Sequence, residues 1–167
     1  MIAMAYKPLF ILLVVFLIGA GLLFYGAFFF RKDRTWDEGV VTVRGNEFDV
    51  FIADTAALRA QGLSGRESLR GDEGMFFIFD SPARQSFWMR DMKFPIDIVW
   101  ISGERVVDIS KNVPIPAPGT SMFSLPTYSP KEPIDRVLEV NAGMADRLGI
   151  QAGDVVHFSP KRMAGIL

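Results

Sequence analysis

The feature that most constrains this chain is an apolar run near its N-terminus. From Leu9 to Phe30 the sequence contains no charged residue and no proline. A helix of about 22 residues is about 33 Å long, which matches the hydrocarbon core of a bilayer. Tyr6 and Tyr25 are placed where an amphipathic ring can lie near a membrane interface. We therefore predict that this run is one transmembrane helix, held by membrane lipid.

A cleaved signal peptide is the alternative interpretation of the run. Its apolar region would be shorter and would end at small residues. Here the small residues 19–21 lie in the middle of the run, and Leu22, Leu23 and Phe24 follow them. We therefore predict an uncleaved signal anchor in a single-pass protein of the cell membrane.

The charges that flank the run bear on its orientation. Arg31, Lys32 and Arg34 follow it, whereas only Lys7 precedes it. The positive-inside rule, taken alone, would place the following domain in the cytoplasm. So few charges around a single span constrain orientation only slightly.

The composition excludes several classes of function. The chain has no cysteine, which excludes disulfides, thiolate metal sites and thiol nucleophiles. Its one histidine, His157, lies in a predicted strand, so a histidine-rich zinc site is excluded. The net charge is −1 and no basic stripe is present, so we expect no nucleic-acid partner. We also predict no cofactor and no bound metal.

The chain after the run has the pattern of a strand-rich domain. Residues 40–44 and 47–53 alternate apolar and polar side chains around Gly45 and Asn46, which predicts a β-hairpin. Similar patterns predict further strands at residues 75–79, 85–89, 96–101, 105–112, 136–140 and 155–158.

Two short helices and one long loop complete the predicted domain. We expect a helix from Asp54 or Thr55 to Gln61, ended by Gly62, and a second helix over residues 142–148, capped by Asn141. Six prolines in residues 113–133 exclude regular structure there.

The fold class that we predict is α+β and mainly β. It is a small antiparallel β-barrel-like domain with a few short helices, preceded by one transmembrane helix. Its predicted parts are the anchor with its flanks (1–34), a neck (35–39), the β-rich domain (40–160) and a tail (161–167).

Six segments of the domain resemble one family of proteins. They are residues 59–66, 74–79, 87–92, 95–101, 138–143 and 149–154, in that order. Together they are similar to the domain of unknown function 192. The resemblance implies a small β-rich domain that follows a signal peptide or one membrane anchor, and we therefore favour an extracytoplasmic location. One departure is Asp91-Met92, where members of the family often carry Asn-Thr.

The best cluster for chemistry lies in residues 88–97. It combines Trp88, Arg90, Asp91 and Asp97 around a turn at Pro95. If the turn brings the two carboxylates together, their pKa values separate into an acid and a base, which makes them candidate catalytic residues. The same pair is also suited to a hard cation such as calcium. The alternative is structural: Trp88 is core, Asp97 holds a loop through backbone amides, and Arg90 is solvated.

Two arginines near Gly62 are further candidates. Arg59 and Arg66 have guanidinium groups that can bind a carboxylate or phosphate through paired hydrogen bonds. The alternative is an internal ion pair, with Glu139 among the possible partners. Glu139 stands between Leu138 and Val140, so it is either a surface residue or a buried partner of an arginine.

These observations lead to three hypotheses about function. The first is a membrane-anchored binding module for a polar small molecule, a glycan or a peptide, with Arg59, Arg66, Trp88, Arg90 and Asp97 as candidate ligand-binding residues. The second is a carboxylate-dependent hydrolase of a glycan or similar polar substrate, which uses Asp91 and Asp97. The third is a scaffold domain for a membrane protein partner.

Overall fold

The computed structural model describes residues 36–161. They belong to one compact unit, which begins at Trp36. The predicted anchor at residues 9–30 lies outside the described residues, as do the rest of the segment 1–34 and most of the tail. Within residues 36–161, none of the helices has the length and apolar character that a bilayer crossing requires.

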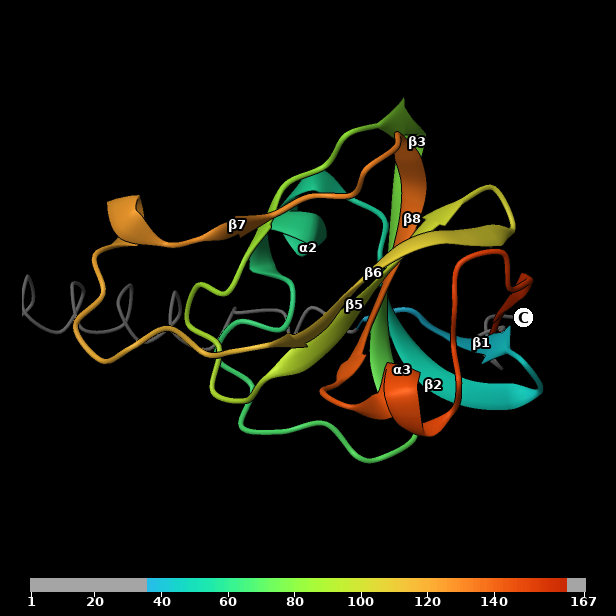
Figure 1. The fold of residues 1–167 in the computed structure, drawn as a ribbon, viewed down its shortest axis with the longest axis horizontal. Helices are drawn as coiled ribbons and strands as arrows, with labels where there is room; N and C mark the ends of the chain where they lie inside the picture. Colours follow the sequence, from blue (N-terminus) through green and yellow to red (C-terminus); the bar gives the residue numbers. More distant parts are fainter. Residues whose placement is uncertain (1–35, 162–167) are drawn as a thin grey trace, which may run out of the picture. The chain divides into compact units, whose positions relative to one another are not determined.

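A seven-stranded sheet and two short helices form this unit (Figure 1). The main sheet has the strand order β6-β5-β8-β3-β2-β1-β9, and β4 and β7 form a separate two-stranded ribbon. The elements are β1 (Glu38–Val43), β2 (Asn46–Ala53), α2 (Ala56–Gln61), β3 (Glu73–Ala83), β4 (Phe87–Trp88), β5 (Ile96–Ser102), β6 (Arg105–Val113), the 3₁₀ turn η1 (Met122–Ser124), β7 (Thr127–Tyr128), β8 (Ile134–Asn141), α3 (Met144–Arg147) and β9 (Val156–Pro160).

The predicted hairpin is confirmed by the antiparallel pair β1–β2. Its turn residues are Arg44 and Gly45 rather than the expected Gly45 and Asn46, and they have positive φ angles of 51° and 75°. Two positive φ values at a two-residue turn match the twist of the flanking strands. Along β1, Val41 and Val43 are buried in alternation with less buried residues, as a half-buried strand requires.

The prediction of a mainly β domain with a few short helices is confirmed, but the prediction of an antiparallel β-barrel-like arrangement is wrong. The sheet is open, with β6 and β9 at its edges, and a single isolated bridge joins Arg105 of β6 to Val155, which directly precedes β9. One pair, β2–β3, is parallel. Residues 54–72 connect these strands and include α2, and a parallel pair needs such a long crossover. A local alternation pattern specifies a strand but not the direction of its neighbour.

The sheet has an apolar core on each face. Successive residues of β8 alternate between them, with Leu138 and Val140 on one face and Val137 on the other. The first core, here called the α3-side core, includes Met144 and Ala145 of α3. The second, the α2-side core, includes Met75, Phe77, Ile98, Trp100 and Val137, with Leu58 of α2 packed against it.

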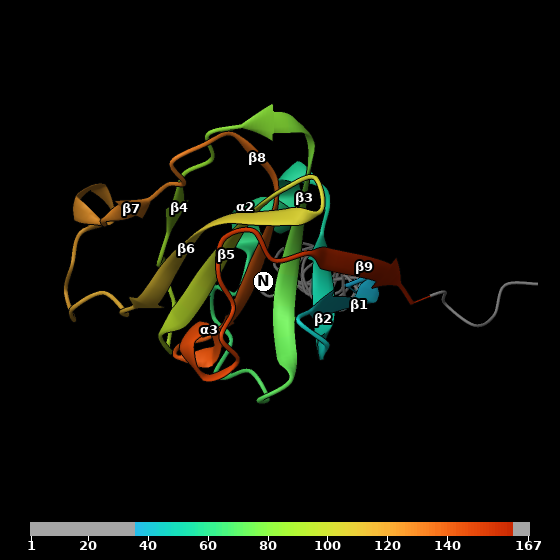
Figure 2. The ribbon, with the colours of Figure 1, turned by 45° about the vertical axis from the view of Figure 1, so that its right-hand side comes forward.

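The ribbon β4–β7 lies beside the α2-side core rather than in the main sheet (Figure 2). Phe87 pairs with Tyr128 and Trp88 with Thr127, so the segment after β3 is joined to the proline-rich loop. The predicted strand at residues 85–89 is therefore only two residues long. We find that Asn141 does not cap α3. Its side chain donates instead to the carbonyls of Leu69 and Arg70, and Gly143 occupies the N-cap position.

Candidate functional site

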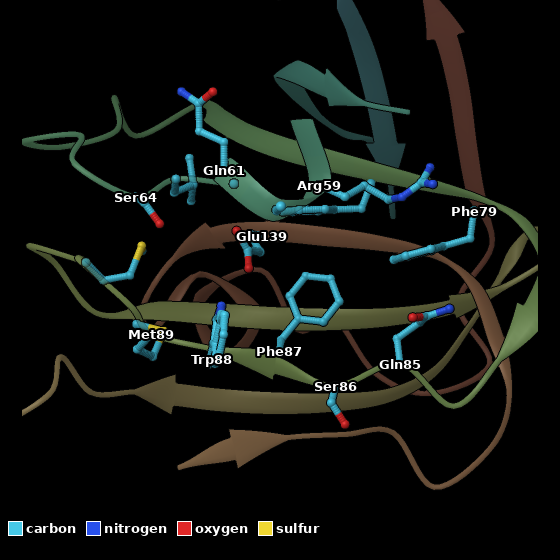
Figure 3. Close-up of a pocket in the computed structure, with 15 residues that line it drawn as sticks. Arg59, Gln61, Ser64, Phe79, Gln85, Ser86, Phe87, Trp88, Met89 and Glu139 are labelled. Carbon is cyan, nitrogen blue, oxygen red and sulfur yellow. The ribbon is translucent and has the colours of Figure 1, made fainter. Parts of the chain in front are cut away.

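A cavity of about 210 Å³ opens on the face of the sheet that carries the α2-side core. The end of α2 and the following turn form one wall, and the segment around β4 forms the other (Figure 3). Four aromatic side chains, two glutamines, two serines and two methionines are among the lining residues, together with one carboxyl group, that of Glu139.

The α2 wall is positioned by the two ends of its helix. The Thr55 hydroxyl accepts a hydrogen bond from the Leu58 amide at 3.2 Å and caps the first turn. Gly62, with a φ of 50°, ends the helix. Arg59 Nη1 donates to the carbonyls of Asp54 and Ile78 at 2.6 and 2.7 Å, which ties α2 to the end of β2 and to the middle of β3.

The β4 wall is held by packing between aromatic rings. The Phe87 ring meets the rings of Phe77 and Trp100 edge to face, with centroid distances of 4.9 and 5.3 Å. Such contacts restrict the orientation of the rings as well as burying them. Trp88 lies at the rim, where 47% of its surface is exposed. The wall is therefore a fixed apolar surface with one accessible indole.

Glu139 lies between the two walls (Figure 3). It belongs to β8, at the centre of the sheet, where it pairs with Met75 of β3 and Ile98 of β5. Only 6% of its surface is exposed, and burial away from water raises the pKa of its carboxyl from 4.5 to about 8. At pH 7 the carboxyl is mainly protonated, so it can both donate and accept a hydrogen bond.

Asp97 is on the opposite face of the sheet from this cavity. It pairs with Val140 and is fully buried. Its Oδ1 accepts from the Asn112 amide at 2.7 Å, and its Oδ2 accepts from the Ala145 amide at 2.8 Å. The carboxylate thereby joins the end of β6 and the first turn of α3 to β5. Both oxygens are occupied by backbone groups, which is the arrangement of a structural carboxylate.

Asp91 is at the surface and does not meet Asp97 in a common cleft. Its side chain is 74% exposed and approaches Arg90 Nε at 3.7 Å. Its backbone has a φ of 56°, and its carbonyl accepts from the Gly65 amide at 2.9 Å. The proposed turn therefore directs the two carboxyl groups to different environments.

Of the predicted arginines, only Arg59 lines the cavity. Arg90 Nη2 donates to the Ala60 carbonyl at 3.3 Å, and its guanidinium lies 5.1 Å from the centre of the Trp88 ring. Arg66 lies over the Phe51 ring at 3.8 Å, and burial lowers its pKa, although nearby Glu73 opposes the shift. Among residues 36–161, no ion pair joins either Arg59 or Arg66 to Glu139.

The structure thus brings Arg59 and Trp88 together at one cavity and adds Glu139, which was not among the predicted site residues. The sequence did contain a pattern that predicts this role for Glu139. A charged residue between two apolar residues of a central strand is buried, because both faces of such a strand are covered. Asp91, Asp97, Arg66 and Arg90 do not line the cavity. Within the described part of the chain, no group of three or more acidic or histidine side chains is arranged to hold a metal.

Comparison with known proteins identifies the family. The family model described as "DUF192: Uncharacterized ACR" matches residues 39–158. No curated protein matches the chain.

Two solved structures are similar to this one. A protein of unknown function from Novosphingobium aromaticivorans DSM 12444 is 34% identical, with a TM-score of 0.63, and the match covers 72% of this chain and 83% of that one. A protein from Sinorhizobium meliloti 1021, described as a "putative transcription regulator", is 26% identical, with a TM-score of 0.68, over 75% of this chain and 97% of that one. The family match spans most of the chain, and the chain therefore belongs to the DUF192 family.

Proposed function

We propose that this protein is a membrane-anchored binding module that takes a small ligand into the cavity between α2 and β4. The observation that carries the proposal is the position of Glu139, a buried carboxyl at the centre of the sheet that lines this cavity. Concave sites with apolar walls and a few polar groups are the usual form of small-molecule sites.

Binding is favoured over hydrolysis because the cavity offers one carboxyl group. Glycoside hydrolysis commonly uses two carboxylates, about 5 to 9.5 Å apart, on either side of the scissile bond. Among the residues that line the cavity, Glu139 is the only acidic one, and Asp97 is bound to backbone amides on the other face.

Two features support a location at the membrane. The first is the apolar run at residues 9–30. The second is the loop of residues 113–130, which contains no charged residue and exposes Met122 and Phe123, the latter with 94% of its surface. Exposed apolar side chains on an uncharged loop are suited to a lipid interface or to a protein partner. We propose that the domain lies on the extracytoplasmic side.

Methionine methyl groups offer a direct test of the cavity. Met89 and Met92 line it, whereas Met144 is in the α3-side core and Met122 is on the exposed loop. Full-length protein in lipid nanodiscs, labelled with ¹³C at the methionine methyls, would be titrated with n-butanol. We expect saturable shifts of the Met89 and Met92 signals and no saturable shift of the other two.

Two aromatic variants complete this test. Trp88→Ala removes part of the β4 wall and should weaken the binding of n-butanol several-fold, whereas Phe123→Ala removes an exposed ring away from the cavity and should leave it unchanged. Equal shifts of these four methionine signals would contradict the proposed site. Equal affinities of the two variants for n-butanol would also contradict it.

A further inference from the structure

The Glu139 carboxyl has no partner within the described chain. None of the side-chain hydrogen bonds or ion pairs formed by residues 36–161 involves it, and desolvation alone accounts for its raised pKa. A buried carboxyl without a partner costs several kcal/mol when it ionises, so proteins usually pair such groups.

Asp97 shows how the same fold satisfies a buried carboxylate when the role is structural. Two backbone amides approach its oxygens at 2.7 and 2.8 Å. The Glu139 carboxyl accepts no such backbone hydrogen bonds from residues 36–161 and instead faces the cavity, between Gln61 and Ser64 on one side and Phe87 and Trp88 on the other (Figure 3). The contrast indicates that the partner of Glu139 comes from outside the chain.

Among the residues that the structure describes, the arginines nearest the cavity form no ion pair with Glu139, although Arg90 Nε is itself buried without a hydrogen-bond partner. Arg59 is the only other ionisable side chain that lines the cavity, and its Nη1 is directed to the carbonyls of Asp54 and Ile78. The guanidinium of Arg90 lies by the Ala60 carbonyl and the Trp88 ring. Neither supplies a positive charge to Glu139.

The aromatic walls are also suited to a cation. Phe77, Phe87 and Trp88 line the space around Glu139, and the edge-to-face contact of Phe77 with Phe87 keeps the rings in place. Ring faces attract ammonium groups, and the attraction increases where water is excluded. A carboxylate beside aromatic side chains therefore favours a positive nitrogen over a neutral or negative group.

We infer that the ligand is a small organic cation, a protonated amine on a short apolar stem, whose ammonium group pairs with Glu139 while its stem lies against Phe87 and Trp88. This inference rests on the proposed binding function of the cavity and adds the chemical class of the ligand. The ammonium donates to the carboxylate, and binding releases the proton that Glu139 otherwise holds.

The test compares three probes of one size: n-butylammonium, n-butanol and butanoate. Each is titrated into the full-length protein in nanodiscs, with the Met89 and Met92 methyl signals as reporters. At pH 8 we expect n-butylammonium to bind about tenfold or more tightly than n-butanol, and butanoate to bind least.

The dependence on pH is part of the same test. Alkylammonium groups stay charged between pH 6 and 8, as lysine does. Because Glu139 ionises with a pKa of about 8, the affinity for n-butylammonium should rise about 50-fold from pH 6 to pH 8, whereas that for n-butanol should not rise. Glu139→Gln should abolish the preference for the amine and its pH dependence, and the exposed Asp91→Asn should leave both intact.

The outcomes separate the two proposals. If n-butanol binds as tightly as n-butylammonium, or Glu139→Gln keeps the preference for the amine, the cavity binds ligands but the inferred class is wrong. If none of the probes shifts Met89 and Met92, both the binding function and the ligand class are wrong. A dispersed methyl spectrum of Glu139→Gln verifies that this variant folds.

Discussion

At the scale of single residues, two buried carboxyl groups in neighbouring strands have different surroundings. Asp97 accepts two backbone amides and holds β6 and α3 in place. Glu139, on the opposite face, has a pKa raised to about 8 by desolvation. Both oxygens of Asp97 are satisfied by backbone hydrogen bonds, whereas desolvation favours the neutral form of Glu139.

Replacing Glu139 with glutamine should stabilise the protein in a pH-dependent way. The pKa of this carboxyl is 4.5 ordinarily and about 8 in the folded protein, so the folded state binds the proton more tightly than the unfolded state. The free energy of unfolding of the wild-type protein therefore falls as the pH rises from about 4.5 to about 8, by about 4 kcal/mol in total. The free energy of unfolding of Glu139→Gln should not show this fall with pH, because glutamine does not ionise.

Urea unfolding of the full-length protein in detergent, at pH values from 5 to 8, measures this effect. The free energies of unfolding of the variant and the wild-type protein should be close at pH 5 and should diverge as the pH rises. Curves that stay parallel over this range would mean that Glu139 is ionised in the folded protein at pH 5 and has a partner.

At the scale of secondary-structure elements, the contact of β3 with β8 sets the position of Glu139. A Cβ atom at Gly74 would lie 2.7 Å from the Glu139 carbonyl oxygen and 3.2 Å from Leu138 Cδ1. The two strands approach each other at a point where a side chain has no room, and a glycine in a strand often marks such an approach. The close packing of these strands fixes the backbone that presents Glu139 to the cavity.

Substitution of Gly74 by alanine should therefore destabilise the sheet. We expect the free energy of unfolding to fall by about 2 kcal/mol, because the added methyl group must displace backbone or buried side-chain atoms. Gly71→Ala is the matched control, since nothing lies within 4 Å of its Cβ position, and it should change stability by less than about 0.5 kcal/mol. Urea unfolding of both variants measures these changes. Equal losses in the free energy of unfolding would mean that the close approach of β3 and β8 is not the cause.

For the whole molecule, the central expectation concerns the membrane. The run at residues 9–30 should keep the full-length protein in the membrane fraction after an alkaline carbonate wash, and removal of residues 1–34 should release the remainder into the aqueous fraction. Full-length protein found intact in the aqueous fraction without detergent would refute the anchor.

The side of the membrane can be measured in the same cells. Because the chain has no cysteine, Phe123→Cys introduces a single thiol at the most exposed apolar position of the loop. A membrane-impermeant maleimide should label this variant in intact spheroplasts if the domain is extracytoplasmic. Labelling only after lysis would place the domain in the cytoplasm, as the flanking charges alone suggest.

Local sequence patterns determined most of the secondary structure of this protein. The β1–β2 hairpin, the cap of α2 at Thr55 and the strand character of β3, β5, β6 and β8 follow from period-two alternation and from turn and cap residues, which act over a few neighbours. The family resemblance in residues 59–154 is also confirmed by the match over residues 39–158.

The tertiary structure alone decided the order of the strands, the parallel β2–β3 pair, the open edges and the composition of the cavity. Glu139 comes from β8, whereas Arg59 and Trp88 come from segments about 80 and 50 residues earlier. Their meeting depends on which strands pair and on which side chains fill each face, and such long-range packing leaves no local periodicity in the sequence. For the same reason the spacing of Asp91 and Asp97 was misleading, because Asp91 lies at the surface whereas Asp97 is buried on the face of the sheet opposite the cavity.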